Sequence, residues 1–251
     1  MIPYFTIELP KIFGLPIQIF GVMVAIGFLV GDHLVKKRTL SQGLDVRVIQ
    51  SIVMICIFVG LISAHVFDSA FYEPRILFTD FREFLDFRTR LSSMGGTIGA
   101  AIGCWIYLRR KSLPFLPYAD VVTFGYVPGW FFGRIGCFLV HDHPGKMTDF
   151  FLGVQFPGGT RHDLGLYDAL LLGFIWIVLV LVDKRTKLKP FHGYFIAIFF
   201  VIYSVGRFGF DFLRIQESRM GSLTFAQYAC ILMFAIGTYL LIRKPYPVIP
   251  K

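Results

Sequence analysis

The stretch VIQSIVMICIFVGLISAHVF, residues Val48–Phe67, contains no Asp, Glu, Lys or Arg in 20 positions. A helix needs about 20 mainly apolar residues to cross the hydrocarbon core of a bilayer, so this stretch predicts a membrane-spanning helix. Similar apolar runs recur on both sides of it, and two of them contain one charged residue each, Arg134 and Asp168. The other predicted spans are Ile12–Gly31, Leu91–Leu108, Val121–Val140, Leu164–Val182, Pro190–Gly206 and Met220–Ile242. The sequence therefore predicts an all-α fold, a polytopic membrane protein with seven transmembrane helices.

The net charge of +9 is distributed unevenly along the chain. With seven spans, loops 36–47, 109–111 and 183–189 and the C-terminal tail fall on one side of the membrane. Together they hold fourteen Lys and Arg residues but only two Asp residues. Lys and Arg accumulate in cytoplasmic loops, so the N-terminus is predicted outside and the C-terminus in the cytoplasm. The charge therefore indicates membrane topology, and we predict no nucleic-acid partner.

The composition fits a chain that lies mostly in lipid. Hydrophobic residues make up 55% of the 251 and charged residues 16%, which leaves too little polar surface for a soluble domain. We expect one integral membrane domain, residues 1–251, whose loops 68–93 and 141–165 form a small extracytoplasmic cap. In the first loop, apolar residues at near-helical spacing fit either an amphipathic interfacial helix or a loop anchored by its aromatic residues.

Charged and histidine side chains gather at the outer ends of four spans. These residues are His65, Asp68, Arg134, His141, Asp142, His143, Arg161, His162, Asp163, Asp168, Arg207, Asp211 and Arg214. A charge within the bilayer costs at least ~2.5–3.5 kcal/mol on insertion scales, so such residues usually face a cavity and serve a function. Arginine binds phosphate oxygens in a bidentate manner, so the cluster fits an anionic phospholipid headgroup. The alternative is that the arginines snorkel to the surface or pair with aspartates for structure.

The remaining reactive residues give weaker signals. His141 and His143 in the stretch HDHPG fit a metal pair or an acid–base pair, but they lack further strong ligands nearby in the sequence. Cys137 fits a nucleophile or simply a small apolar residue. The four cysteines form no CxxC pair, so they indicate neither a zinc site nor a disulfide framework. We predict no metal and no cofactor.

Four segments, in order along the chain, resemble the motifs of the prolipoprotein diacylglyceryl transferase family. They are SSMGGTIGA (92–100), GRIGCF (133–138) with Gly145, RHDLGLYD (161–168), and RFGFDFLR (207–214) with GSLTFAQ (221–227). The resemblance implies a multi-pass enzyme of the bacterial inner membrane. Such an enzyme moves the diacylglyceryl group of phosphatidylglycerol to the thiol of the lipobox cysteine of a preprolipoprotein and releases glycerol phosphate. The implied partners are phosphatidylglycerol or a similar anionic phospholipid, the preprolipoprotein signal peptide and membrane lipid.

The resemblance also implies roles for the matched residues. Arg134 and Arg207 would bind the phosphate side of the lipid, and Asp142, Asp211 and His162 would orient or pair with them. The implied substrate-binding positions are Phe20, Met94, Gly95, Gly96, Cys137, Gly145, Arg161, Tyr167, Asp211 and Arg214. Because the nucleophile belongs to the substrate, replacing Cys137 with Ala is expected to leave activity intact.

The chain departs from the family pattern at several of these positions. The replacements are Phe20 for Tyr, Met94 for His, Cys137 and Val140 for two Asn, and Asp142 and Asp211 for two Glu. Met94 and Phe20 cannot transfer a proton. Either His141 or His143 would then act as the base, or a positive local field would lower the pKa of the substrate thiol. The departures also leave open a paralogue that is non-catalytic or has another acceptor, and that binds phospholipid or lipoprotein.

Overall fold

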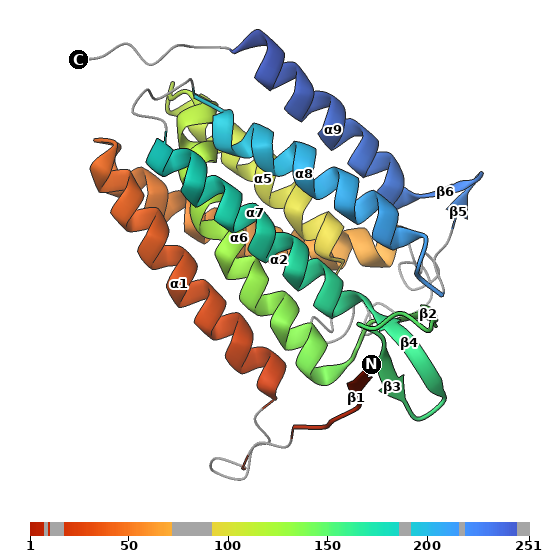
Figure 1. Cartoon of the computed structure of the whole chain (residues 1–251). Helices are drawn as coiled ribbons and strands as arrows, with labels where there is room; N and C mark the ends of the chain where they lie inside the picture. Colours follow the sequence, from red (N-terminus) through yellow and green to blue (C-terminus); the bar gives the residue numbers. More distant parts are fainter. Residues whose placement is uncertain (8–9, 11–17, 72–91, 186–191, 216–218, 245–251) are drawn as a thin grey trace. The chain divides into compact units, whose positions relative to one another are not determined.

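The computed structural model describes residues 1–7, 10, 18–71, 92–185, 192–215 and 219–244 of the chain. It divides into two compact units, one formed by residues 1–37 and 119–251 and the other by residues 38–118. The elements, labelled in Figure 1, are β1 (Ile2–Pro3), α1 (Ile19–Ser41), α2 (Val46–Phe71), α5 (Ser93–Arg110), α6 (Phe115–Val140), β2 (Pro144–Met147), β3 (Val154–Phe156), β4 (Gly159–Asp163), α7 (Leu164–Arg185), α8 (Tyr194–Asp211), β5 (Arg219–Met220), β6 (Leu223–Thr224) and α9 (Phe225–Arg243).

A helix stands at each of the seven positions where a span was predicted. Five of them, α1, α2, α7, α8 and α9, are long and apolar enough to cross a membrane. Of the other two, α5 carries four glycines and two terminal arginines, and α6 contains Asp120, Pro128 and Arg134. The structure therefore supports a polytopic helical membrane protein with five candidate spans.

The helix ends do not coincide with the limits of the predicted apolar spans, and local capping explains the start of α9. α9 begins at Phe225 rather than at Met220, because Thr224 and Gln227 form a capping box at its N-terminus. Residues 219–224 instead form the hairpin β5–β6. α8 continues past the predicted end at Gly206 to Asp211, so that Arg207 lies inside the helix.

The apolar core of the first unit lies where α6, α7 and α8 meet. Its buried residues are Val127, Leu172, Ile175, Leu179, Phe195, Ile198, Phe199 and Tyr203. Asp120 of α6 fixes the start of α8: its carboxylate accepts hydrogen bonds from the four backbone N–H groups of residues 193–196, at 2.6–3.1 Å. Intrahelical bonding leaves such groups unpaired at a helix N-terminus, so this one side chain aligns α6 with α8.

Glycines let the helices of each unit approach closely. In the first unit, Gly27 and Gly31 of α1 meet Gly125 and Gly129 of α6, where an added Cβ would strike the facing backbone carbonyl. This is the small-xxx-small contact typical of membrane helices. In the second unit, α5 packs on α2 through the stripe 95, 99 and 103, three glycines one turn apart.

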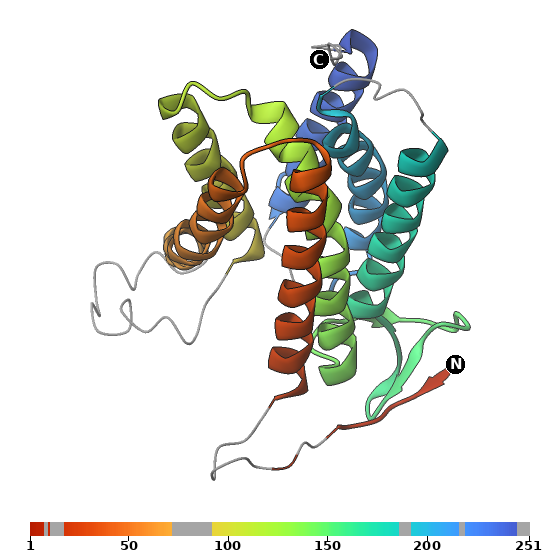
Figure 2. The same ribbon diagram turned by 90° about the vertical axis from the view of Figure 1, so that its left-hand side faces the viewer.

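A small sheet follows α6. Its strand order is β1-β3-β4-β2, with β3–β4 and β4–β2 antiparallel and the N-terminal β1 parallel to β3. Figures 1 and 2 show this sheet at one end of the first unit's helices, where α6 ends and α7 begins. The predicted loop 141–165 thus contains three of the four strands. Of the other predicted loop, 68–93, residues 72–91 lie outside the described part, and with them the proposed interfacial helix.

Candidate active site

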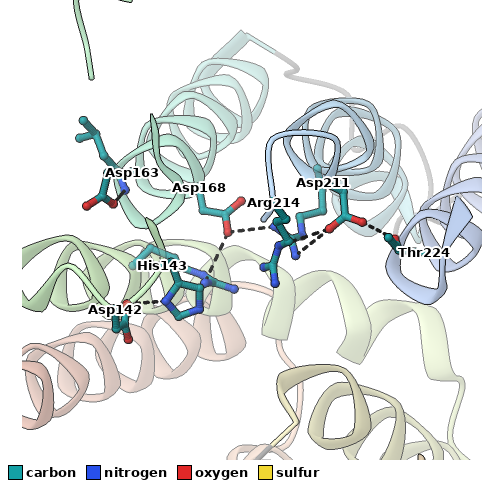
Figure 3. Close-up of polar contacts among 10 residues, drawn as sticks. Asp142, His143, Asp163, Asp168, Asp211, Arg214 and Thr224 are labelled. Atoms are coloured by element: carbon teal, nitrogen blue, oxygen red, sulfur yellow. Dashed lines mark hydrogen bonds and ion pairs between the residues drawn. The ribbon is translucent and has the colours of Figure 1, made fainter. Parts of the chain in front are cut away.

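Three arginines and two aspartates of the first unit form a continuous buried ion-pair network (Figure 3). Nη1 of Arg134 lies 3.4 Å from Oδ2 of Asp168, and Nη1 of Arg207 lies 3.5 Å from the same oxygen. Asp211 receives Nη2 of Arg207 at 3.4 Å and Nε of Arg214 at 3.3 Å. α6, α7, α8 and the segment after α8 therefore each contribute to one cluster.

The ion pairs are longer than the 2.7–2.9 Å of a well-formed charge-assisted hydrogen bond. Neither carboxylate oxygen of Asp168 accepts a hydrogen bond in the described part of the chain, and Nε of Arg134 donates none there. Each guanidinium has five N–H donors. Asp168 therefore orients Arg134 and leaves it N–H donors with which to bind a further anion. Three cations against two anions give the network a positive excess.

The sequence places Asp168 in the charged cluster but indicates no particular role for it. It lies in α7, is 1% exposed, and is the carboxylate that both Arg134 and Arg207 approach. The available signal was its place at the end of RHDLGLYD, one of the four segments that carry the family resemblance. A second omission is Trp130, whose ring lies 5.6 Å from the Arg134 guanidinium carbon, one helical turn away.

The start of α9 supports Asp211 from the other side. The hydroxyl of Thr224, the N-cap of α9, donates a hydrogen bond to Oδ2 of Asp211. Gln227, the partner of Thr224 in the capping box, also donates to the backbone carbonyl of Phe208, at 3.3 Å. Hydrogen bonds from the segment GSLTFAQ (221–227) therefore join α9 to the charged end of α8.

Gly145 ties the sheet to the same end of α8. It forms a β-bridge with Arg214, and the N–H of Lys146 donates to the carbonyl of Leu213 at 2.8 Å. A Cβ on Gly145 would stand 2.9 Å from that carbonyl oxygen and 3.0 Å from Cβ of His162, so no larger residue fits between the two segments. Nη1 of Arg161 donates to the carbonyl of Gly145 at 3.4 Å. Arg161 and Arg214 thus lie on opposite sides of one strand.

The predicted histidines occupy different surroundings. His141 is buried among the rings of Tyr4, Phe5, Phe138 and Phe156, and its Nδ1 lies 2.8 Å from Oδ2 of Asp163. Burial raises the pKa of Asp163, and the hydrogen bond with His141 opposes that rise. These contacts join the N-terminal segment to the sheet, which favours a structural role for His141 over that of a base.

His162 and His143 are more accessible. Nδ1 of His162 lies 2.7 Å from the hydroxyl of Tyr167, and burial lowers the pKa of His162, which keeps its ring neutral to lower pH. His143 hydrogen-bonds to Asp142 through Nδ1, and the pair is partly exposed. Asp142 and His162 therefore pair with neighbours other than the arginines that the resemblance assigns to them, whereas Asp211 does contact arginines.

The remaining predicted site residues are Phe20, in the first unit, and Met94, Gly95 and Gly96, in the second. Phe20, at the start of α1, packs against Gly136 of α6, where a Cβ would lie 3.1 Å from Cδ2 of its ring. Met94 lies in the first turn of α5. Gly95 and Gly96 belong to the contact of α5 with α2, because a Cβ on Gly95 would overlap the side chain of Phe67.

The arrangement can bind and neutralise an anion. Guanidinium groups with spare donors in a water-poor site stabilise negative charge that develops on a leaving group, because opposite charges attract more strongly there than in water. Among the described residues, this network of arginines and aspartates contains no Ser, Thr or Lys side chain. The geometry therefore suits a reaction in which the protein stabilises a negatively charged leaving group.

Comparison with known proteins identifies one family. Residues 8–243 match the family model described as prolipoprotein diacylglyceryl transferase. The phosphatidylglycerol–prolipoprotein diacylglyceryl transferase of Clostridioides difficile is 30% identical over 86% of this chain and 86% of its own length. Proteins of the same name from Campylobacter lari and Nitratidesulfovibrio vulgaris are 28% and 29% identical, over 92% and 90% of this chain and 90% and 88% of theirs.

Proposed function

Because this chain belongs to the prolipoprotein diacylglyceryl transferase family, we infer that it transfers the diacylglyceryl group of phosphatidylglycerol to a prolipoprotein. It is a transferase of lipoprotein biogenesis. We propose that the acceptor atom is the thiol of the lipobox cysteine of a preprolipoprotein signal peptide. The single observation that carries this function is the buried network in which Arg134 and Arg207 converge on Asp168.

The network fits the charge changes of this reaction. The substrate thiolate attacks the glyceryl carbon that bears the phosphate, a sulfur–carbon bond forms, and the carbon–oxygen bond to phosphate breaks. The electron pair of that bond stays on the phosphate, so negative charge develops on the leaving glycerol phosphate. Arg134 and Arg207 stabilise that charge as it forms, which lowers the barrier because the interaction is stronger in the transition state than in the bound lipid.

The other residues of the proposed site have supporting roles. Asp168 and Asp211 hold the arginines, and Arg161 and Arg214 extend the positive surface on either side of the β2 strand. Neutral His162, with Tyr167, offers a hydrogen-bonding pair beside the same strand. The other proposed substrate-binding positions are those that the family resemblance implies: Phe20, Met94, Gly95, Gly96, Cys137 and Gly145.

We propose a membrane arrangement in which all seven helices, α5 and α6 included, cross the bacterial inner membrane. The excess of Lys and Arg in loops 36–47, 109–111 and 183–189 supports a cytoplasmic location for that side and for the C-terminus. The N-terminus, the small sheet and the arginine network then lie toward the outer face. There the sheet and loop 68–93 form a cap on a single membrane domain.

Purified protein in phosphatidylglycerol nanodiscs tests the proposal directly. A synthetic lipobox peptide should gain the mass of a diacylglyceryl group, read by mass spectrometry. Arg134→Gln and Arg207→Gln should each lower the rate by at least about 100-fold, the size expected for loss of a group that stabilises transition-state charge. Arg243→Gln, at the exposed end of α9, is the matched control and should keep the rate.

The Clostridioides difficile relative serves as the positive control in the same assay. If it modifies the peptide while this chain gives no adduct with several lipobox sequences, the transferase proposal is refuted. The paralogue that only binds lipid or lipoprotein would then be the better account. Retained activity in both Arg134→Gln and Arg207→Gln would instead move the site away from the network.

A further inference from the structure

The end of α6 brings together three side chains that sequence reasoning treated separately. His141 adopts a left-handed conformation, with φ of 51°, which turns the chain back over the helix end. The N–H of Asp142 consequently lies 3.4 Å from the carbonyl of Cys137. The Cys137 sulfur, a carboxylate oxygen of Asp142 and a ring nitrogen of His143 lie within 4.8 Å of one another.

These three groups form a set of metal ligands. Thiolate, carboxylate and imidazole are the ligands that Zn²⁺ takes in proteins, and catalytic zinc sites use three protein ligands with a fourth position open. Around a tetrahedral Zn²⁺ the ligand atoms stand about 3.5 Å apart, as follows from Zn–ligand distances of about 2.0–2.3 Å. Small rotations of the partly exposed Asp142 and His143 side chains would bring the ligand atoms from their present separations to this spacing, while Cys137 stays buried.

The cluster adjoins the arginine network. Cys137 follows Arg134 by three residues in α6, so the two lie on one face of the helix, one turn apart. Cys137 is a buried residue, and its thiol lies within hydrogen-bond reach of the Asp142 carboxylate. His141 is not part of the set, because it is bonded to Asp163, which lies outside the set; the hydrogen bond of His143 to Asp142 lies inside the set and would be exchanged for bonds to the metal.

We propose that Cys137, Asp142 and His143 bind Zn²⁺, and that the open fourth position takes the sulfur of the lipobox cysteine. This inference rests on the proposed transferase function. A thiol that coordinates Zn²⁺ is deprotonated, so the metal supplies the thiolate that the reaction needs at neutral pH. The chain then requires no general base, which accounts for Met94 in place of the family's His.

The step balances without any further reactant. The substrate thiol binds Zn²⁺ and its proton passes to water. The sulfur then uses one electron pair to form the bond to the glyceryl carbon, and the departing phosphate oxygen takes the pair of the broken carbon–oxygen bond. The product thioether is neutral and a weaker ligand than a thiolate, so it leaves the metal. The nucleophile lies on the Cys137 side and the leaving group on the Arg134 side of one site.

The inference reverses the expectation from the sequence that replacing Cys137 has no effect. Metal binding is the first test, made on the full chain in detergent micelles with Zn²⁺ and Co²⁺ as probes. Wild-type protein should retain about one Zn²⁺ per chain after gel filtration, by elemental analysis. With Co²⁺ it should show a thiolate-to-cobalt charge-transfer absorption. Cys137→Ser should lose both signals, and His143→Asn should lose the bound Zn²⁺.

Cys230→Ser is the matched control, since Cys230 is another buried thiol of the first unit, in α9. It should keep the metal and the cobalt spectrum. If a Cys137→Ser protein fails to fold, His143→Asn still decides the question, because His143 is partly exposed. Metal content that does not differ between His143→Asn and Cys230→Ser overturns the site.

Transfer to the lipobox peptide is the second test. Chelator treatment should lower the wild-type rate by at least about 100-fold, and Zn²⁺ should restore it, as expected when a metal and its ligand shell are lost. Wild-type rates should change little across the pKa of a free thiol, near 8.5, whereas rates of His143→Asn should rise with pH through that range. A structural role of the cluster would not produce this change in the pH profile.

The outcomes separate this inference from the proposed function. A wild-type protein that transfers diacylglyceryl groups equally well with chelator keeps the transferase function and refutes the metal's role. A protein that binds Zn²⁺ through Cys137 but modifies no peptide refutes the proposed function, and the thiol-activating role falls with it.

Discussion

Asp168 stands between two guanidinium groups, so its charge matters to both Arg134 and Arg207. Asp168→Asn keeps the shape of the side chain but leaves those buried cations without a shared counter-charge. Breaking a buried ion pair from one side costs about 3–5 kcal/mol, so we expect a clear fall in the free energy of unfolding. Activity should fall as well, because the arginines lose their orientation.

Urea titration in micelles and the lipobox-peptide assay measure the two effects of that change. Asp168→Glu is the informative control, since it restores the charge on a longer side chain. It should recover much of the stability and rate. If Asp168→Asn proves as stable and active as wild type, Asp168 does not organise the site.

His162 gives a pH dependence whose sign is fixed by its environment. Burial lowers the pKa of His162 in the fold, so the unfolded chain takes up its proton first as the pH falls. The stability that neutral His162 contributes is present above about pH 6.5 and is lost as the pH drops through the interval below it. We expect the melting temperature of wild type to fall more than that of His162→Gln between neutral and mildly acidic pH. Equal falls would contradict this prediction.

At this scale the sequence identified the arginines, because charged groups in apolar stretches are conspicuous. It did not identify their connections. That Asp211 contacts Arg207 follows from helical spacing, but Asp168 reaches both arginines only because α7 packs beside α6 and α8. The approach of Cys137 to His143 depends on the left-handed backbone of His141, which no pattern in the sequence reveals.

At the scale of the elements, the contact of α1 with α6 gives a direct test of packing. A Cβ on Gly27 would strike the carbonyl of Gly129, whereas a Cβ on Gly21, in the same helix, meets nothing within 4 Å. Gly27→Ala should therefore destabilise the fold by about 1–3 kcal/mol, the usual cost of overpacking. Gly21→Ala should be neutral or slightly stabilising, because alanine favours helix.

Melting temperatures in one detergent compare the two variants directly. If both substitutions shift the melting temperature equally, the contact drawn between α1 and α6 is not the one that limits stability. The helices themselves were predictable from apolar runs, but their ends were less so. Thr224 starts α9 late because its side chain caps the helix, and hydropathy does not register a cap.

At the scale of the whole molecule, the proposed orientation can be read by labelling. Gly158 lies in the exposed turn between β3 and β4, and its Cβ position meets nothing within 4 Å. In intact spheroplasts, a membrane-impermeant maleimide should label Gly158→Cys but not Lys251→Cys, each made in a chain whose four cysteines are replaced by Ser. Permeabilised cells should label both. Labelling of the C-terminal cysteine in intact spheroplasts would reverse the topology.

The membrane class and the family were predictable at this scale, because apolar runs and the four motifs extend over the whole chain. The small sheet was not predictable as such. Its strands are short, and β1 joins β3 across about 150 residues of sequence. The sheet formed by residues 141–165 thereby gains its fourth strand from the N-terminal segment of the chain.

The close approach of α1 and α6 also restricts how a lipid can travel. Where Gly27 and Gly31 face Gly125 and Gly129, main chain rests against main chain with no side chains to swing aside. A hydrocarbon tail is far too thick for such a seam, and widening it would separate two closely fitted surfaces. A phospholipid that enters the bundle from the side would therefore pass between other helices more easily than through this contact of α1 with α6.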